Sequence, residues 1–225
     1  MTALGKLYQE IDQRGQAALA TGQEELDPNL LPGAHDTRLG LTLLGRLPAH
    51  VCRNIEFYLQ ALAQLAPDQY YYPAADMHVT VMDLLAAWPD QQISPATFAR
   101  YQRVVADLVA TAPAPHWHFQ GLVVSPGAIM VKGFYSPALT TLRQRLRQAV
   151  PAAGLDLAER YPTISGHVTV VRFRQRLAHP TALARKLADA QAVDFGSFTM
   201  PSLDLVVHDW YNHQVPMTVT LPFAR

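Results

Sequence analysis

The sequence predicts a mixed fold of strands and helices that is built from two similar halves. Three observations predict it. The tetrapeptide His-Val-Thr-Val (HVTV) occurs twice, at 78–81 and 167–170, 89 residues apart. Strand and helix candidates follow one another in the same order around each copy. A proline stands 30 residues before each histidine, Pro48 before His78 and Pro137 before His167. We expect such halves to pack about a pseudo-twofold axis, with the two HVTV strands facing one another.

The elements of the first half can be justified in order. Residues 3–20 carry an apolar stripe at helical spacing, and the acidic, turn-rich residues 21–36 indicate a connecting loop. Ser94 followed by Pro95 is typical of a helix start, because serine caps the first turn and proline suits its first position. The expected order is strand 38–46, helix 49–66, the strand that contains His78, and helix 94–111.

The second half repeats this order. Strand candidates at 117–124 and 128–135 flank a Ser-Pro-Gly turn, and Ser136-Pro137 opens a helix. The remaining expected elements are the strand that contains His167, a helix from about residue 180, and strands near 198–208 and 215–222.

The domain organisation follows from the repeat. We expect residues 37–225 to form a single bilobal domain, with residues 1–36 as an N-terminal helix and connecting loop outside it. The repeat halves would span about 37–112 and 117–192, with closing strands within 198–222.

Composition narrows the class of protein. The 225 residues are 49% apolar and 16% charged, which is typical of a globular protein with a substantial core. No run approaches the roughly 18 apolar residues of a membrane span, and the N-terminus becomes charged too early for a secretory signal. The single cysteine, Cys52, leaves no internal disulfide and favours a cytoplasmic location.

Charge is distributed unevenly, although the formal net charge is zero. A net charge of zero argues against a protein that coats long nucleic acid. Residues 1–112 carry a net −5 and residues 113–225 a net +5. Part of the positive half is Arg172, Arg174 and Arg176, directly after the second HVTV. This run is either a solvated face or a binding site for a local anion such as a phosphate.

Each HVTV copy places two polar side chains on one face of a strand. Because alternate residues point to opposite faces, His78 shares a face with Thr80, and His167 with Thr169. The intervening valines would pack in the core. One such histidine is more often structural than catalytic, but two matched copies favour a shared site with two imidazoles and two hydroxyls.

The paired tetrapeptides resemble the H-x-T-x signature of the two-histidine (2H) phosphoesterase superfamily, the LigT-like or 2′-5′ RNA ligase-like proteins. The resemblance covers about residues 37–222 and indicates a divergent branch. It implies a bilobal α+β fold in which two antiparallel sheets, flanked by helices, border a central groove. It also implies activity on 2′,3′-cyclic phosphates, 2′,5′-linked oligonucleotides or related RNA ends, without a metal or other cofactor.

The resemblance assigns roles to matching positions. His78 and His167 match the catalytic pair, and Thr80 and Thr169 match the residues that hydrogen-bond the phosphate. Arg172 stands where many second motifs have an arginine, so it is a further substrate-binding candidate. The first motif departs from the LigT-like pattern, because Asp-Leu-Leu at 83–85 replaces the common phenylalanine-leucine-glycine.

Three other residues near the motifs are weaker substrate-binding candidates, with packing as the alternative for each. Tyr72 precedes the first motif and could stack on a base, and Lys132 and Tyr135 lie on the strand before Ser136. Histidines outside the motifs include His116 and His118, but no helical H-x-x-x-H or cysteine pair predicts a zinc site.

The residue types suit phosphoester chemistry without reference to the family. An imidazole has an unperturbed pKa of about 6.5. Near pH 7 one histidine can therefore remove a proton while a protonated partner supplies one to the departing oxygen. Threonine hydroxyls can donate to phosphate oxygens. The sequence leaves open which histidine is acid and which is base.

Other functions are also compatible with these residues. The same face could hold a phosphorylated ligand without catalysis, or both histidines could be structural. Binding alone needs no acid–base pair, which favours an enzyme, and ligation is the reverse of the same cleavage. We expect a small nucleotide or RNA end as the partner, and no membrane or obligate protein partner.

Overall fold

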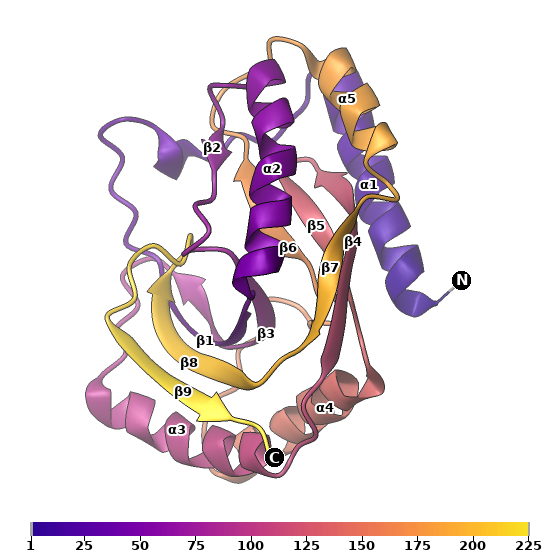
Figure 1. Cartoon of the computed structure of the whole chain (residues 1–225). Helices are drawn as coiled ribbons and strands as arrows, with labels where there is room; N and C mark the ends of the chain where they lie inside the picture. Colours follow the sequence, from indigo (N-terminus) through magenta and orange to yellow (C-terminus); the bar gives the residue numbers. More distant parts are fainter. Residues whose placement is uncertain (1, 225) are drawn as a thin grey trace.

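The computed structural model describes residues 2–224 (Figure 1). The helices are α1 (Ala3–Thr21), a short 3-10 helix (Pro28–Leu30), α2 (Ala49–Leu65), α3 (Pro95–Ala110), α4 (Pro137–Ala152) and α5 (Pro180–Asp189). The strands are β1 (Leu39–Arg46), β2 (Tyr70–Tyr71), β3 (His78–Trp88), β4 (His116–Ser125), β5 (Ala128–Tyr135), β6 (Val168–Arg172), β7 (Asp194–Thr199), β8 (Ser202–Asp209) and β9 (Met217–Pro222).

The strands form two antiparallel sheets in which corresponding strands of the two halves occupy corresponding places. The four-stranded sheet has the order β3-β1-β8-β9 and is strongly curled (Figure 1), and the five-stranded sheet has the order β2-β6-β5-β4-β7. Apart from β2, each order begins with an HVTV strand beside the strand that leads into α2 or α4. The predicted α+β fold, with its duplicated unit, is confirmed.

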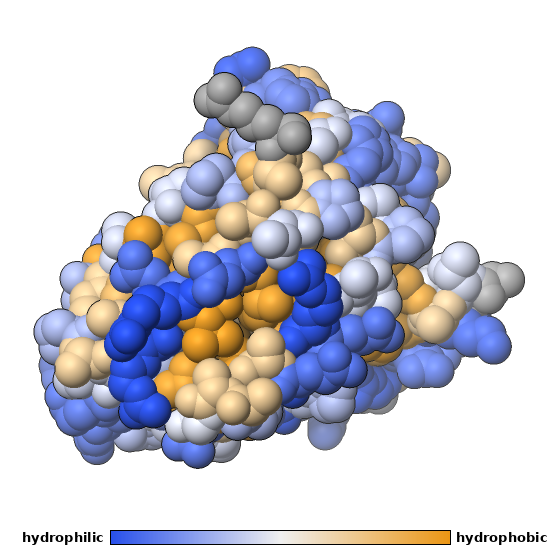
Figure 2. All heavy atoms as spheres, turned by 90° about the horizontal axis from the view of Figure 1, so that it is seen from below, coloured by the Kyte–Doolittle hydropathy of each residue, from blue (hydrophilic) through white to orange (hydrophobic). Residues whose placement is uncertain are grey.

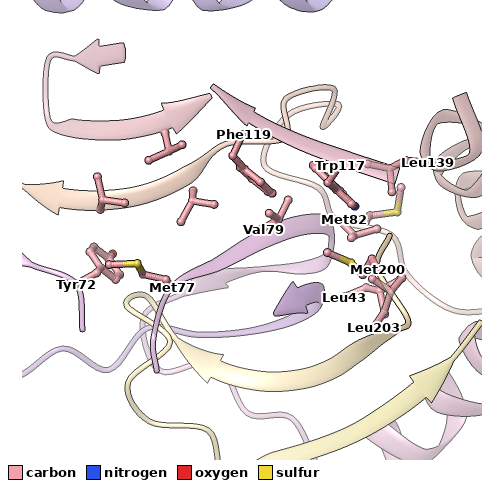
Figure 3. Packing of buried hydrophobic residues seen from close by; sticks show 14 of the residues in the cluster. Leu43, Tyr72, Met77, Val79, Met82, Trp117, Phe119, Leu139, Met200 and Leu203 are labelled. Carbon is pink, nitrogen blue, oxygen red and sulfur yellow. The ribbon is translucent and has the colours of Figure 1, made fainter. Parts of the chain in front are cut away.

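The apolar face of each HVTV strand belongs to the main core. Figure 3 shows Val79 of β3 and Phe119 of β4 in the layer between the two sheets. Val79, Val81, Val168 and Val170 are completely buried, whereas the histidine and threonine of each motif are only partly buried. Each buried valine stabilises the fold by about 1.5 kcal/mol or more. The expected alternation along both strands is therefore observed.

The N-terminal helix α1 packs against β4. A Cβ at Gly15 would lie 2.1 Å from the carbonyl oxygen of Val124, so a larger residue would push the helix away from the sheet. The hydroxyl of Tyr8 reaches the backbone of Gly133 and Gly166. The domain boundary at residue 36 remains a prediction, and α1 contacts the five-stranded sheet directly.

The prediction of one strand over 198–208 is wrong. The chain forms β7 and β8 instead, and these pair with β4 and β1 in different sheets. The break falls at Met200 and Pro201, where proline has no N–H for a ladder. The short strand β2 was not predicted.

α3 and α4 pack against each other at one end of the molecule (Figure 1). Figure 2 shows an apolar hollow on this side, bordered by strongly hydrophilic residues. A shallow hollow between the helices is lined by Arg100, Arg103, Val104, Ala153 and Leu155. Within residues 2–224, no helix has the length and apolar character needed to cross a membrane.

Candidate active site

The two HVTV strands are joined through the buried side chain of Arg143 on α4. Its Nε donates to the carbonyl oxygen of Val81 at 2.7 Å. Its Nη2 donates to the carbonyl oxygen of Thr80 at 3.1 Å and to that of Ser165 at 2.8 Å. One guanidinium nitrogen thus contacts backbone beside both motifs. This arrangement holds β3 and β6 next to each other.

Each motif strand contains a β-bulge directly after its threonine. In β3, Val81 is the extra residue between the pairs Leu44–Thr80 and Leu43–Met82. In β6, the extra residue lies between the partners of Ile129 and Met130. A bulge reverses the alternation of the residues beyond it.

The bulges bring a charged residue back to the histidine–threonine side of each strand. This residue is Asp83 in β3 and Arg172 in β6, and both are partly exposed between buried neighbours. Thr42 donates to Asp83 Oδ1 at 3.0 Å, and burial raises the pKa of this carboxyl group. Two strands with matching backbones therefore present opposite charges.

His78 is oriented by backbone. Its Nδ1 lies 2.8 Å from the carbonyl oxygen of Asp76, which accepts only, so Nδ1 carries a proton. In the neutral ring Nε2 is then free to accept a proton. The ring also meets His208 of β8 edge to face, with centroids 5.8 Å apart. His208 is buried, and its Nδ1 has no hydrogen-bond partner among the described residues.

His167 has a different partner. Its Nδ1 lies 3.0 Å from the hydroxyl of Ser165, which can donate or accept. Both tautomers of this ring are therefore compatible with its surroundings. The hydroxyl of Tyr8 accepts from the N–H of Gly166, directly before the histidine, so α1 braces this motif.

Burial and nearby cations keep the imidazoles neutral. Burial is the main cause that lowers the pKa of His78 and of His167 to about 4. Arg46 and Arg172 lower the pKa of His78 further. Arg172 and His78 do the same to His167, so the two imidazoles lie within electrostatic reach of each other. Both rings are uncharged near pH 7 in the free protein, unlike the unperturbed pair considered from sequence.

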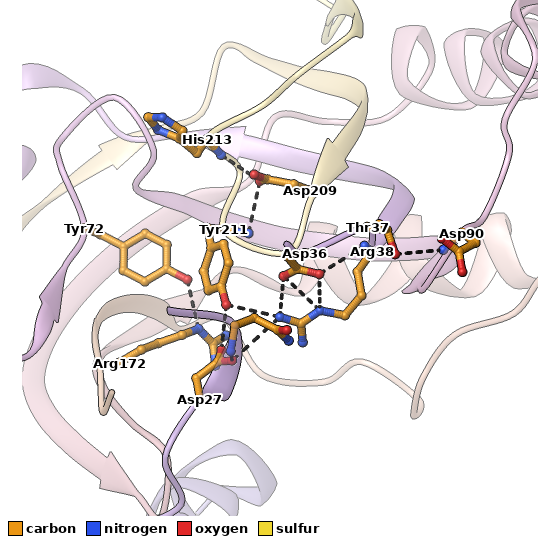
Figure 4. Close-up of polar contacts among 11 residues, drawn as sticks. Asp27, Asp36, Thr37, Arg38, Tyr72, Asp90, Arg172, Asp209, Tyr211 and His213 are labelled. Atoms are coloured by element: carbon orange, nitrogen blue, oxygen red, sulfur yellow. Dashed lines mark hydrogen bonds and ion pairs between the residues drawn. The ribbon is translucent and has the colours of Figure 1, made fainter. Parts of the chain in front are cut away.

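The weaker substrate-binding candidates have different surroundings. Tyr72 is buried, and its hydroxyl accepts from Arg172 Nε at 2.9 Å (Figure 4), so it positions this arginine and offers no exposed face to a base. Tyr135 lies near the site, but its hydroxyl donates to the Ile164 carbonyl and accepts from Arg143.

Lys132 on β5 stays a predicted ligand contact, and its amino group already has protein partners. Its Nζ is bound to the carbonyl and side-chain oxygens of Gln191. Met130 and Phe134, two residues to either side on β5, contact Tyr8 of α1. Lys132 therefore shares the face of β5 that points to α1, because strand residues two apart point the same way.

Arg143 was missed in the sequence. It stands on the apolar stripe of α4, with Leu139 four residues before it and Leu146 three residues after it. An arginine at a core position of a helix needs buried acceptors, and this was the available signal. Within residues 2–224, no group of three His, Cys, Asp or Glu side chains is arranged to hold a metal ion.

Comparisons with known proteins agree with the fold. No curated protein matches the chain. Among solved structures, Thermus thermophilus TT0787 is 15% identical with a TM-score of 0.53, over 84% of this chain and 100% of that one. E. coli LigT in its apo form is 13% identical with a TM-score of 0.54, over 84% and 99% of the two chains. The LigT complex with 3′-AMP has a TM-score of 0.52 at 13% identity, with the same coverage. These likenesses concern the fold.

The model of the 2′-5′ RNA ligase superfamily matches residues 44–211, and the chain belongs to this family.

Proposed function

We propose that the protein is a metal-independent phosphoesterase for a 2′,3′-cyclic phosphate or 2′,5′-phosphodiester of a nucleotide or RNA end. The observation that carries this proposal is the pairing of the two HVTV strands by Arg143, with both imidazoles in mutual electrostatic reach. Structures of E. coli LigT with ATP, 3′-AMP and NADP⁺ support a nucleotide as the ligand. The single cysteine still favours a cytoplasmic location.

The proposed reaction divides the proton transfers between the histidines. A neutral imidazole removes a proton from water, whose oxygen attacks phosphorus. The P–O bond to the leaving ribose oxygen breaks, and a protonated imidazole supplies that oxygen with a proton. Thr80 and Thr169 donate to the non-bridging oxygens, and Arg172 neutralises their charge.

The low pKa values of the free protein are compatible with this reaction. A bound phosphodiester is an anion, and an anion beside an imidazole raises its pKa. Binding would therefore favour protonation of one of the two rings, His78 or His167. His78 has its Nε2 free to act as the base, because Nδ1 donates to the backbone.

The test is a screen of the purified protein against 2′,3′-cyclic nucleotides, 2′,5′-linked dinucleotides and ADP-ribose cyclic phosphate. Products are followed by chromatography and phosphorus NMR. We expect turnover of at least one of these classes, and unchanged turnover after exhaustive treatment with EDTA.

The control is the double variant His78→Ala/His167→Ala, purified in the same way. Equal turnover by this variant would indicate a contaminating enzyme. Nucleotide binding without turnover would instead support a non-catalytic binding module. Loss of activity with EDTA and recovery with zinc or manganese would contradict the metal-independent mechanism.

A further inference from the structure

Three arginines surround a single indole beside the second HVTV strand. The guanidinium carbons of Arg38, Arg160 and Arg172 lie 4.5, 4.7 and 5.2 Å from the ring centroid of Trp210. Such contacts stabilise individual cations, but three like charges around one ring repel each other. The cluster therefore requires compensating negative charge.

Only one of these arginines is neutralised by the protein. Arg38 forms a forked ion pair with Asp36, and Asp27 lies 3.8 Å away (Figure 4). Neither Arg160 nor Arg172 has a carboxylate within 4.0 Å among residues 2–224. Arg172 donates only to the neutral hydroxyl of Tyr72. Two positive charges remain, and their guanidinium carbons are at most about 10 Å apart.

The ring between them has an unused donor. The indole N–H of Trp210 is buried and has no acceptor among the described residues. An indole nitrogen only donates, so a complementary ligand would supply an acceptor oxygen. Arg160 is itself exposed, as is its neighbour Tyr161.

The cluster is continuous with the HVTV site. Arg172 lowers the pKa of both motif histidines, so its positive charge also acts on the position between them, where the reacting phosphate would lie. Burial raises the pKa of Asp83, and the charge of Arg160 partly offsets this rise without forming an ion pair, so Arg160 lies within electrostatic reach of Asp83. The positive charge therefore extends beyond what a single phosphate at the histidines would neutralise.

We propose that Arg160, Arg172 and Trp210 form a second phosphate subsite, so that the preferred ligand carries another phosphate beside the reacting phosphodiester. This inference rests on the proposed function, because it places the first phosphate between His78 and His167. Arg160 binds the second phosphate, and Trp210 donates to it.

The test compares two stable ligands by isothermal titration calorimetry, and needs no turnover. Adenosine 3′,5′-bisphosphate carries the additional phosphate, and 3′-AMP lacks it. We expect the wild-type protein to bind the bisphosphate about 10-fold more tightly. Arg160→Gln should reduce this ratio to about 2 or less, and Trp210→Phe should give an intermediate value.

The matched control is Arg103→Gln, which removes an exposed arginine on α3, far from the motifs. It should keep the wild-type ratio. Inorganic phosphate, titrated alone, distinguishes a general anion site from a subsite that needs the nucleotide. If phosphate alone binds Arg160 as tightly as the bisphosphate does, the subsite as proposed is wrong.

The remaining outcomes separate the two proposals. A wild-type ratio near 1, or an unchanged ratio in Arg160→Gln, overturns the second subsite even if a phosphodiester is hydrolysed. A ratio of about 10 that depends on Arg160, without turnover in the substrate screen, supports the subsite and contradicts the phosphoesterase. If neither nucleotide binds, both proposals are overturned.

Discussion

β3 and β6 carry the same tetrapeptide and the same bulge, but they occupy different places and carry different charges. β3 is the edge of its sheet, whereas β6 lies between β2 and β5. Beyond the bulge β3 presents Asp83 and β6 presents Arg172. His78 contacts a backbone carbonyl and His208, while His167 contacts a serine hydroxyl.

The two halves therefore share the backbone course and the reacting histidines and threonines. They differ in the charge of the residue that lies beyond each bulge. Two symmetric strands would bind a symmetric ligand. Here the β6 side attracts an anion and the β3 side offers a carboxyl group to donors. We therefore expect the ligand to bind in one fixed orientation, with its reacting phosphate beside Arg172 of β6.

The largest effect is expected where both strands depend on one side chain. Arg143→Met should lower the free energy of unfolding by about 2 to 5 kcal/mol, because the carbonyls of Thr80, Val81 and Ser165 lose a buried charged donor. Chemical denaturation measures this loss. Arg145→Met, on the same helix, should cost less than about 1 kcal/mol. Equal stability of both variants would contradict the role of Arg143.

Acid should destabilise the protein, with the larger share on the β3 side. The folded-state pKa is about 4 for His78 and His167 and about 3 for His208, against about 6.5 unfolded. Between these values the unfolded chain binds protons that the folded protein does not. Stability is therefore complete above about pH 6.5 and is lost toward pH 4, by at most about 3 kcal/mol for each of the three imidazoles.

Denaturation at several pH values measures this loss. His208→Asn should reduce it, and the same change at exposed His50 should leave it unchanged. A stability that does not change between pH 6.5 and pH 4 would show that the three imidazoles are not desolvated.

The contact between α1 and the sheet should stabilise β5 and the residues directly before β6, and not β3. Tyr8→Phe leaves the N–H groups of Gly133 and Gly166 without their acceptor, at a cost of about 1 to 3 kcal/mol. Tyr161→Phe, at an exposed tyrosine, is the control and should change little. A loss of stability as large for Tyr161→Phe would contradict a specific contact.

The smallest effect concerns the two charged residues beyond the bulges. Arg172→Gln should weaken the binding of 3′-AMP by about 10-fold, since it removes the cation beside the phosphate. Asp83→Asn removes a like charge and should leave binding equal or up to about 3-fold tighter. Calorimetry measures both. Equal weakening in the two variants would show that the strands act symmetrically.

Most of the fold could be predicted from local patterns. α3, α4 and α5 begin at the expected prolines, and α2 begins directly after Pro48. The equal spacing from Pro48 to His78 and from Pro137 to His167 indicated the repeat. The break between β7 and β8 was missed although Pro201 stands inside the predicted strand 198–208. Proline is tolerated on an edge strand, and only the pairing with two different sheets separates β7 from β8.

The candidate site was predicted in part. Strand alternation correctly placed each histidine on the same strand face as its threonine. A β-bulge depends on pairing with the neighbouring strand, so the sequence could not predict that Asp83 and Arg172 would point to this same face. The contacts of Arg143 with both strands and of Arg160 with Trp210 join residues far apart in the chain. The contact of Lys132 with Gln191 could not be predicted either, because it joins β5 to the loop after α5.

In the proposed mechanism the two histidines act as one unit, and single-turnover hydrolysis measures whether they do. The substrate found in the screen is given to His78→Ala, His167→Ala and the double variant. Each single change should slow the reaction by about 10²-fold or more, and the double change should cost little beyond the worse single change. The wild-type rate should have a bell-shaped dependence on pH, and its two apparent pKa values should describe the coupled pair of histidines. Near wild-type turnover by His78→Ala, with no activity in His167→Ala, would contradict the two-histidine mechanism.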